Sequence, residues 1–176
     1  MQYCFIIQTI YFFLPAGFAN MAPVLFQNRF SWFARPIDGG ATIRGRRVFG
    51  EHKTIRGLVC GLFLGTGIAY LQSFHPFPSM EIVTYDSWFL LGFLQSTGAL
   101  LGDLIKSFFK RQLGIPPGKP WVPFDQLDFI MGAILLSSLF FSIPVKYIIS
   151  AFIMAPFFHI TINRVGYYLK IRQTPW

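Results

Sequence analysis

The chain has 176 residues, of which 53% are hydrophobic and 12% are charged, whereas a soluble domain has about one quarter charged residues. The apolar residues form long runs, which excludes an ordinary soluble core. The runs indicate an all-α polytopic membrane protein with about five spans. We expect a single domain over residues 1–176. The net charge is +8, but the basic residues lie between apolar runs, which favours anionic headgroups or nucleotide phosphates and argues against nucleic acid.

The first apolar run predicts a transmembrane helix at about residues 3–25, which Pro15 and Gly17 would kink. Its start, MQYCFIIQ, lacks a basic segment, so we expect a retained span and not a cleaved signal peptide. Asn20 lies near the end of this span. Its amide either packs against a neighbouring helix, as amides in membrane helices commonly do, or orients a site.

A basic cytoplasmic loop is expected at about residues 26–53. Asp38-Gly39-Gly40 predicts a turn. Lys53 and Thr54 come just before the next helix, whose free N–H groups can bind phosphate, although the segment lacks the glycine spacing of a Walker A loop. The alternative is a loop that only contacts anionic lipids. The basic residues of this loop and its edge are Arg29, Arg35, Arg44, Arg46, Arg47, Lys53 and Arg56.

The other spans are expected at about residues 54–72, 88–109, 126–143 and 147–167. Gly57, Gly61 and Gly65 suit close helix packing in the first of these. A loop with Pro76 and Pro78 but no Lys or Arg follows it. A second cytoplasmic loop is expected at about residues 110–125, where four prolines rule out continuous helix.

The distribution of basic residues predicts the orientation. The loop at residues 26–53 and its edge carry seven basic residues. On the same side, the second loop and its edge carry Lys106, Lys110, Arg111 and Lys119, and the C-terminal end carries Arg164, Lys170 and Arg172. The other side of the membrane carries only one basic residue, Lys146. By the positive-inside rule, we expect the N-terminus outside, the C-terminus in the cytoplasm, and a site at the cytoplasmic face of the cell membrane.

The stretch from Gly102 to Asp128 holds three of the seven acidic residues between long apolar runs. Asp103, Lys106, Ser107 and Lys110 are spaced i, i+3, i+4 and i+7, so they share one helix face. Such a face can bind a phosphate complexed to a metal ion. The alternative is that the cations anchor a helix end at the lipid headgroups.

Asp125 and Asp128 are spaced i, i+3 at the expected start of the fourth span. They could serve only as an N-cap and an N3 residue, both favoured by the helix dipole. Together with Asp103, however, they would bring three carboxylates from two helices to one membrane face. Such a cluster can hold one or two divalent cations for phosphoryl or nucleotidyl transfer.

The motif Ser107-Phe-Phe-Lys110-Arg111 followed by Asp125-Gln-Leu-Asp128 resembles the signature of the CDP-diacylglycerol synthase (phosphatidate cytidylyltransferase) family, S-x-x-K-R before D-R-x-D. Lys53-Thr-Ile-Arg-Gly57 resembles the family's K-T-x-E-G segment, with Arg56 where an acid is usual. The chain is most similar to the short archaeal branch, the CDP-archaeol synthases, in three further segments: Pro15-Ala…Ala19-Asn20-Met-Ala-Pro23-Val, Pro36-Ile-Asp38-Gly-Gly, and Gly102-Asp103…Pro123-Phe-Asp125-Gln-Leu-Asp128. The bacterial Lys-Asp and His-Gly-Gly elements are missing, and only Lys119 could replace that lysine.

This resemblance implies a reaction of CTP with a lipid phosphate to give a CDP-lipid and pyrophosphate, with Mg²⁺, by direct in-line attack. For the archaeal branch the lipid is 2,3-bis-O-(geranylgeranyl)-sn-glycerol 1-phosphate. The implied metal ligands are Asp103, Asp125 and Asp128, and the catalytic set adds Lys110 and Arg111. The implied substrate-binding residues are Asn20, Asp38, Arg44, Arg46, Lys53, Thr54, Lys106, Ser107 and Lys119.

Two other functions remain as alternatives. A CDP-alcohol phosphotransferase also uses aspartates and Mg²⁺, but its D-G-x-x-A-R…G-x-x-x-D-x-x-x-D pattern is matched only by Asp38-Gly39. A transporter or scaffold could bind headgroups through the basic loops, yet transporters keep charge near the midplane of the bilayer. The sequence leaves open whether the chain forms a homodimer.

Overall fold

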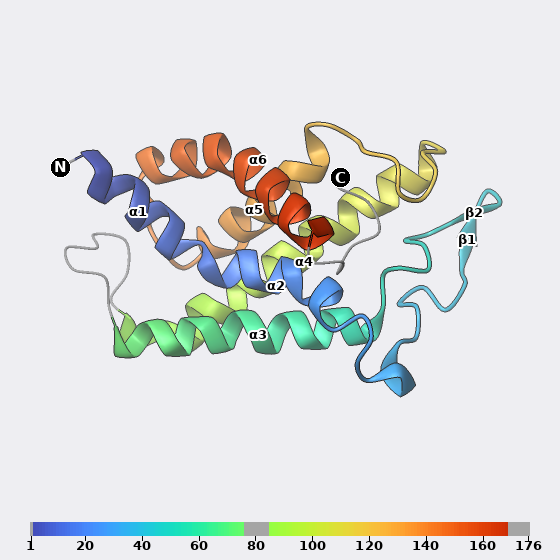
Figure 1. Cartoon of the computed structure of the whole chain (residues 1–176), viewed down its shortest axis with the longest axis horizontal. Helices are drawn as coiled ribbons and strands as arrows, with labels where there is room; N and C mark the ends of the chain where they lie inside the picture. The colour runs from blue at the N-terminus through green and yellow to red at the C-terminus, as the bar shows by residue number, and fades with distance from the viewer. Residues whose placement is uncertain (1, 76–84, 169–176) are drawn as a thin grey trace.

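The apolar runs form helices through most of the chain in this computed structural model, which describes residues 2–75 and 85–168. Pro76, Pro78, Lys170 and Arg172, which entered the topology argument, lie outside the described residues. The α-helices of the described part are α1 (Gln2–Phe12), α2 (Leu14–Leu25), α3 (Ile55–Phe74), α4 (Trp88–Gln112), α5 (Phe124–Ser137) and α6 (Val145–Tyr168) (Figure 1). Two 3-10 turns, η1 (Ser31–Phe33) and η2 (Tyr85–Ser87), complete the helical elements there.

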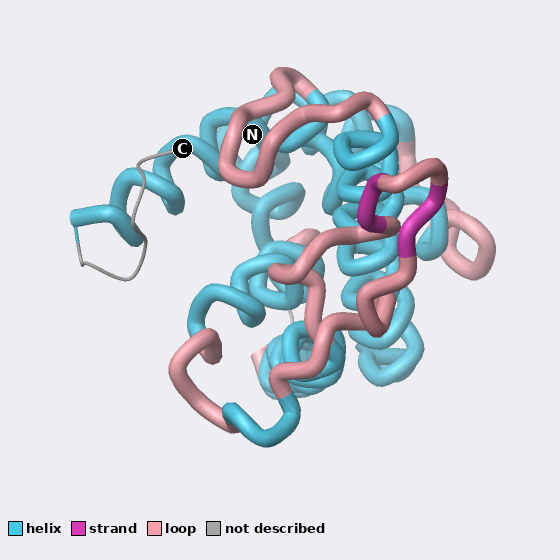
Figure 2. The backbone as a smooth tube through the Cα atoms, turned by 90° about the vertical axis from the view of Figure 1, so that its right-hand side faces the viewer, coloured by secondary structure: helices cyan, strands magenta, loops and turns pink. Residues whose placement is uncertain are grey.

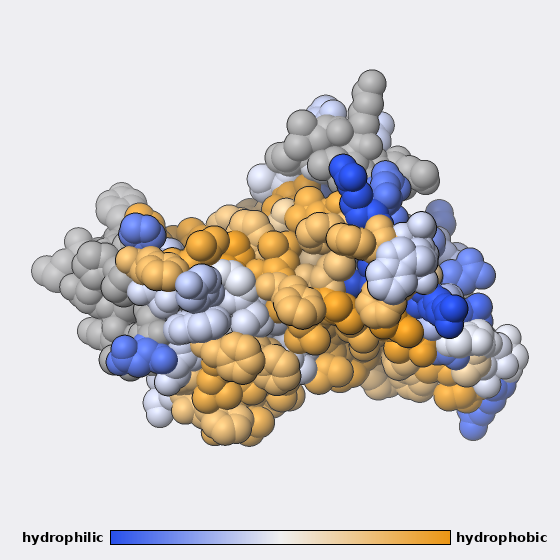
Figure 3. Space-filling model, turned by 90° about the horizontal axis from the view of Figure 1, so that it is seen from below, coloured by the Kyte–Doolittle hydropathy of each residue, from blue (hydrophilic) through white to orange (hydrophobic). Residues whose placement is uncertain are grey.

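Three helices of the described residues, α3, α4 and α6, are long and apolar enough to cross a membrane, and α1 with α2 could form a fourth, bent span. Apolar side chains cover the middle of the molecule, and hydrophilic ones gather toward the side of the first loop (Figure 3). The expected span at residues 126–143 corresponds to α5, which ends at Ser137. Its 14 residues reach about 21 Å, less than the roughly 30 Å of a bilayer core. Five spans therefore stay a prediction.

A side-chain hydrogen bond lies at the early end of α5. The Ser138 hydroxyl donates to the Leu135 carbonyl at 2.9 Å, and so takes up one of the last helix carbonyls. The chain then turns toward Pro144, and the residue before a proline is disfavoured in helical conformation. The sequence prediction extended this helix to Ile143 because residues 139–141 are apolar.

The predicted kink at Pro15 is confirmed: α1 and α2 are bent by 48°. Pro15 has no N–H with which to bond the Tyr11 carbonyl. Gln72 of α3 donates its amide N–H to that carbonyl at 2.5 Å, and Gln95 of α4 donates to the Phe12 carbonyl at 2.9 Å. Two buried amides thus satisfy the carbonyls at the break and fix the direction in which α2 continues.

Glycines bring α4 and α5 into backbone contact. A Cβ at Gly98, Gly102 or Gly132 would lie closer than 3.0 Å to backbone atoms of the other helix, nearer than real Cβ atoms come. At Gly102 the atom in the way is the Asp128 carbonyl oxygen. The crossing therefore requires glycine, and it sets Asp103 beside Asp128. Close packing is also confirmed at Gly61 and Gly65 of α3, which lie against the backbone of α2.

A small β-hairpin in the first loop is the one departure from the all-α prediction within the described residues. Strands β1 (Thr42–Ile43) and β2 (Arg46–Arg47) pair antiparallel, with Thr42 opposite Arg47 (Figure 2). Arg44 and Gly45 join them with positive φ angles of 52° and 74°, which is the pattern of a type I′ turn. Because arginine is not a usual residue at the first of these positions, the hairpin was not predicted.

Candidate active site

Three aspartates from two helices meet around one lysine. The Lys106 Nζ of α4 lies 3.1 Å from Asp103 Oδ1, 3.1 Å from Asp125 Oδ1 and 2.9 Å from Asp128 Oδ2. Asp128 is the most deeply buried of the three carboxylates, with 4% of its side chain exposed. The predicted face of α4 and the start of α5 therefore do come together at one point.

Two more lysines flank this cluster on opposite sides. Lys53, at the end of the first loop, pairs with Asp103 Oδ2. Lys110 Nζ lies 2.9 Å from Asp125 Oδ2 and also donates to the Lys119 carbonyl at 2.7 Å. Three carboxylates are thus matched by three ammonium groups, so the cluster is close to neutral. If a divalent cation and an anionic substrate bind to the cluster together, their charges offset one another and the net charge of the site stays small.

The capping alternative for Asp125 is wrong. Helix α5 begins at Phe124 with Pro123 as its N-cap, so Asp125 lies inside the first turn. Its Oδ2 accepts the Trp121 N–H at 2.5 Å, which orients the carboxylate toward the lysines. Asp128 accepts the Phe129 N–H at 2.6 Å through Oδ1, and its other oxygen faces Lys106.

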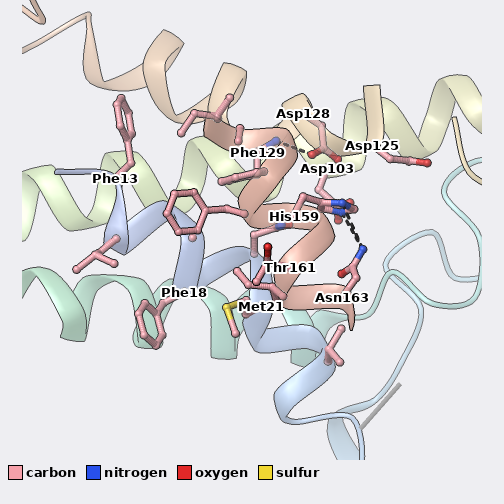
Figure 4. Close-up of a pocket in the computed structure, with 18 of the residues that line it drawn as sticks. Phe13, Phe18, Met21, Asp103, Asp125, Asp128, Phe129, His159, Thr161 and Asn163 are labelled. Carbon is pink, nitrogen blue, oxygen red and sulfur yellow. Dashed lines mark hydrogen bonds between the residues drawn. The ribbon is translucent and has the colours of Figure 1, made fainter. Parts of the chain in front are cut away.

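The cluster forms one end of a cavity of about 530 Å³ (Figure 4). The rest of the cavity is lined mainly by apolar side chains of four helices, such as Ile10 of α1, Met21 of α2, Ile130 of α5 and Met154 of α6. This cavity is amphipathic, with charge at one end and hydrocarbon along its length. The predicted residues that line it are Asn20, Lys53, Asp103, Lys106, Asp125 and Asp128.

Asp38 organises the first loop from inside. Its side chain is only 1% exposed and accepts the backbone N–H groups of Gly40, Phe49 and Gly50 at 3.0–3.1 Å. Arg47 adds a hydrogen bond of 2.7 Å from Nη2. Burial alone would raise the pKa of Asp38, but the Arg47 guanidinium and the three N–H groups hold the pKa well below its usual range. The same hydrogen bond raises the pKa of Arg47.

The ordered loop is fastened to the ends of two helices. Arg46 donates to the carbonyl of Gln112 at the end of α4, and the Gln112 amide donates to the Arg47 carbonyl at 3.3 Å. The Lys53 carbonyl accepts the Ile37 N–H at 2.8 Å. These bonds hold the hairpin over the C-terminal end of α4 and fix the backbone from which Lys53 reaches Asp103.

The remaining predicted residues do not line the cavity. The Thr54 hydroxyl accepts the Gly57 N–H at 3.1 Å and caps α3, so the predicted helix start is confirmed. Arg44 lies in the exposed hairpin turn. Ser107 and Lys110 are buried, and Lys110 pairs with Asp125. The predicted residues outside the lining are Asp38, Arg44, Arg46, Thr54, Ser107, Lys110, Arg111 and Lys119.

A polar pair on α6 was not among the predicted site residues. His159 and Asn163 both line the cavity, and the Asn163 amide lies 3.2 Å from His159 Nδ1. The signal that could have found the pair is two polar side chains spaced i, i+4 in a largely apolar helix.

The donor set suits a hard divalent cation, which takes oxygen ligands from carboxylates. In residues 2–75 and 85–168, no three His, Cys, Asp or Glu side chains stand close enough to hold an ion directly. The Lys106 ammonium lies between the carboxylates that would share an ion. Binding there requires the lysine side chain to move aside.

The chain is similar to known proteins over most of its length. A family model described as CarS-like, CDP-archaeol synthase, matches residues 2–176. Similar curated proteins include the CDP-archaeol synthases of Pyrobaculum arsenaticum (41% identical, covering 92% of this chain and 93% of the relative) and Thermococcus onnurineus (42% identical, covering 94% of each). A solved structure described as an intramembrane enzyme for archaeal membrane lipids biosynthesis matches with a TM-score of 0.76 at 32% identity, covering 90% of this chain and 94% of that one.

Proposed function

The chain belongs to the CDP-archaeol synthase family, a membrane transferase family of lipid biosynthesis, and from this premise we propose how its cavity carries out CTP-dependent formation of CDP-archaeol. The proposed lipid substrate is 2,3-bis-O-(geranylgeranyl)-sn-glycerol 1-phosphate, and the second product is pyrophosphate. The observation that carries the proposal is the cavity that joins a carboxylate and lysine cluster to apolar walls.

The shape of the cavity suits a lipid phosphate. The phosphate would lie at the charged end, near Lys106 and Lys53, and the prenyl chains would extend along the apolar walls of α1, α2, α5 and α6. Burial of hydrocarbon chains along these walls would hold the lipid in place, and the two cations would fix its head. A soluble phosphate has no chains to place there, so the cavity favours a membrane-resident acceptor.

CTP would approach from the first loop. Lys53 already reaches Asp103, and the hairpin with Arg44 and Arg46 lies over the same end of α4. These cations would contact the β- and γ-phosphates of CTP. The Lys53 ammonium would act as a point charge, and the guanidinium groups of Arg44 and Arg46 would donate paired hydrogen bonds. Asp38 takes part indirectly, because its carboxylate is buried and engaged by the loop itself.

Asp103, Asp125 and Asp128 would hold a divalent metal ion once Lys106 moves aside, and cytidylyltransferases of this kind generally use such an ion, for which we propose Mg²⁺. When bound, Mg²⁺ would supply positive charge that stabilises the negative charge on the reacting phosphates and on the departing pyrophosphate. The Lys106 ammonium would then leave the three carboxylates and contact a phosphate oxygen instead. Lys110 would stay on Asp125 and keep that carboxylate ionised and oriented.

The reaction would need positioning rather than a protein nucleophile. An oxygen of the ionised lipid phosphate attacks the α-phosphorus of CTP, a new P–O bond forms, and the bond to the bridging oxygen of pyrophosphate breaks. Holding the two phosphates in line supplies much of the rate enhancement in such transfers. All of the proposed groups come from one chain, so the proposal does not depend on a homodimer.

We propose that the protein lies in the cell membrane with five spans, an external N-terminus and a cytoplasmic site. Support comes from the positive-inside count and from the clustering of Lys53, Arg46 and Lys110 toward one end of the bundle. CTP is a cytoplasmic substrate, so a charged end on that side is required. Labelling of single cysteines placed at Arg44 and Lys146 from either side of sealed vesicles would test this orientation.

The function is tested with purified protein, labelled CTP, Mg²⁺ and either the prenyl-ether lipid phosphate or a diacyl phosphatidate. We expect pyrophosphate release that depends on the lipid phosphate, together with a labelled CDP-lipid. Release of CMP from a CDP-lipid with an alcohol acceptor, and no product from CTP, would instead support a CDP-alcohol phosphotransferase.

A further inference from the structure

The linker of residues 26–35 joins the end of α2 to the rest of the first loop and carries exposed aromatic side chains. Trp32 is 76% exposed and Phe30 is 53% exposed. The Trp32 ring lies against Phe33, with centroids 5.2 Å apart, and the Phe30 ring lies against Phe26, at 6.3 Å. In Figure 1 the turn η1 of this linker projects outward near the start of α3. The linker therefore presents an aromatic surface outside the helix bundle.

The backbone at Phe30 is held in a conformation that bulky residues rarely adopt. Its φ and ψ angles of 53° and 48° lie in the left-handed region, which is normally left to glycine, asparagine or aspartate. The Arg29 N–H donates to the Phe26 carbonyl at 2.9 Å, and the Phe33 N–H donates to the Phe30 carbonyl at 3.0 Å. These bonds stabilise the turn on both sides of Phe30. Strain of this kind is a reason to look for a function of the segment.

Three arginines lie around this linker. Arg56 of α3 donates from Nη1 to the Arg29 carbonyl at 2.9 Å, and the Arg35 carbonyl accepts the Ile55 N–H at 2.9 Å. Neighbouring residues of α3 thus hold both halves of the linker. Within residues 2–75 and 85–168, none of the three arginines forms a salt bridge, and the buried Nε of Arg56 has no hydrogen-bond partner there. Their positive charge is therefore free to attract an anion.

The linker begins where the wall of the cavity ends. Pro23, Val24 and Leu25 of α2 line the cavity, and the linker follows directly. The first turn of α3 packs on the same part of α2, since a Cβ at Gly57 would lie 3.2 Å from the Pro23 Cβ. Arg56 precedes Gly57, so its backbone is held beside the last turn of α2. An anion bound by these arginines would therefore lie close to the cavity.

Exposed aromatic rings beside arginines suit the headgroup layer of a bilayer. Tryptophan is enriched at membrane–water interfaces, and arginine binds phosphate through paired, charge-assisted hydrogen bonds. Helix α3 is long and apolar enough to cross a membrane, and α1 with α2 could form a bent span. The linker that joins α2 toward α3 is thus expected to emerge at a bilayer surface. A nucleotide in water would use the cations but would leave Phe30 and Trp32 exposed.

We propose that the linker and Arg56 enter the headgroup layer and bind the phosphate of an anionic membrane lipid, which gathers the lipid substrate beside the cavity. This inference rests on the proposed function. It divides the first loop into two parts with different ligands. The hairpin with Arg44 and Arg46 faces CTP, whereas the linker faces the lipid.

The test uses the full chain in phosphatidylcholine nanodiscs without CTP, so that no turnover is needed. A brominated phosphatidic acid or a brominated phosphatidylcholine is added, and the quenching of Trp32 is obtained by difference from Trp32→Phe. We expect stronger quenching by the phosphatidic acid. Arg29→Gln and Arg35→Gln should each lower this preference about fivefold, because one basic residue near an anionic surface contributes about that factor. Arg29→Lys keeps the charge and should retain most of it. Arg44→Gln is the matched control, since it removes the same charge from the hairpin.

Two results would overturn the inference: an equal preference in the glutamine variants and the unmodified protein, or loss of the preference on adding glycerol 3-phosphate, which would assign the arginines to a soluble phosphate. Turnover then separates the inference from the proposed function. Arg29→Gln and Arg35→Gln should raise the KM for lipid, expressed as its mole fraction in the membrane, with the KM for CTP unchanged. A rise in the KM for CTP alone would also overturn the inference. Failure of the unmodified protein to form a CDP-lipid would overturn the proposed function, while the quenching of Trp32 would still report lipid binding.

Discussion

The Lys106 ammonium lies 2.9 Å from Asp128 Oδ2, at the point where the carboxylates of Asp103 and Asp125 also converge. An ammonium at this point neutralises three carboxylates that would otherwise repel one another. It also competes with any divalent cation for the same oxygens. The protein thus carries its own counter-ion at the position where we propose that the metal binds.

Lys106→Met should make the protein depend on divalent cations for stability. Removing one partner of a buried ion cluster costs about 3 kcal/mol or more, and Mg²⁺ or Mn²⁺ can replace the missing charge. We expect a lower Tm without metal and a larger rise on adding metal than in the unmodified protein, measured by thermal unfolding in detergent. An equal response to metal in both proteins would contradict the placement of the ion. Arg44→Gln, on the exposed turn, is the control.

Gly102→Ala should separate the carboxylates without changing any of them. The added Cβ would meet the Asp128 carbonyl oxygen, which cannot move unless α5 moves. A displacement of about 1 Å in a reacting site can cost about 100-fold in rate, and we expect at least that loss in CDP-lipid formation. Gly67→Ala is the matched control, because nothing lies within 4 Å of a Cβ there. Equal activity of the two variants would show that the α4–α5 crossing does not set the site.

Asp38→Asn should loosen the first loop and weaken CTP binding. The buried carboxylate holds three backbone N–H groups and Arg47, and an amide cannot accept all of these bonds. We expect faster tryptic cleavage in the loop and a higher KM for CTP, with the KM for lipid unchanged. Glu51→Gln is the control, since Glu51 faces the same Arg47 at 3.8 Å but is 80% exposed. A rise in the lipid KM instead would assign the loop to the lipid headgroup.

The same residue gives a pH dependence with a defined sign. The pKa of Asp38 is lowered in the folded loop, so its contribution to loop stability is complete above the ordinary carboxyl pKa of about 3.9. That contribution is lost as the pH falls from there toward the folded pKa. Asp38→Asn should therefore abolish the acid-induced increase in loop cleavage, which would be followed with an acid-active protease.

Gln95→Leu should destabilise the broken helix. Its amide donates to the Phe12 carbonyl at 2.9 Å, at the break that Pro15 causes. Interhelical hydrogen bonds in membranes contribute about 0.6–2 kcal/mol, so we expect a modest loss of Tm. The bend also directs α2 and Asn20 toward the cavity, so the KM for lipid should rise. An unchanged Tm would mean that another group satisfies the Phe12 carbonyl.

Helical spacing was enough to predict that Asp103 and Lys106 share a face, because i, i+3 pairs meet on any α-helix. The return of Asp125 and Asp128 to that face could be anticipated from the short second loop. The close crossing of α4 and α5 at Gly102 brings Asp128 next to Asp103. This crossing depends on both helices together and could not be predicted from either one alone.

Other features escaped prediction for different physical reasons. Asp38 was assigned to substrate binding by resemblance, whereas the structure shows its carboxylate inside the loop, where donors from residues up to 12 positions away surround it. The hairpin depends on a positive φ at Arg44, which residue type does not reveal. The polar pair on α6 becomes meaningful only once the cavity is known.

The most direct test of the central claim, that the carboxylates around Lys106 form the catalytic metal site, is CDP-lipid formation by Asp128→Asn. The substitution keeps the shape of the side chain but removes one charged ligand, and loss of metal-supplied charge stabilisation predicts a fall of about 1,000-fold or more. Its circular dichroism spectrum and elution volume should match those of the unmodified protein, so that misfolding is ruled out. The account predicts a folded, inactive variant with weakened Mn²⁺ binding. A folded variant that forms CDP-lipid at a rate near that of the unmodified protein would contradict it.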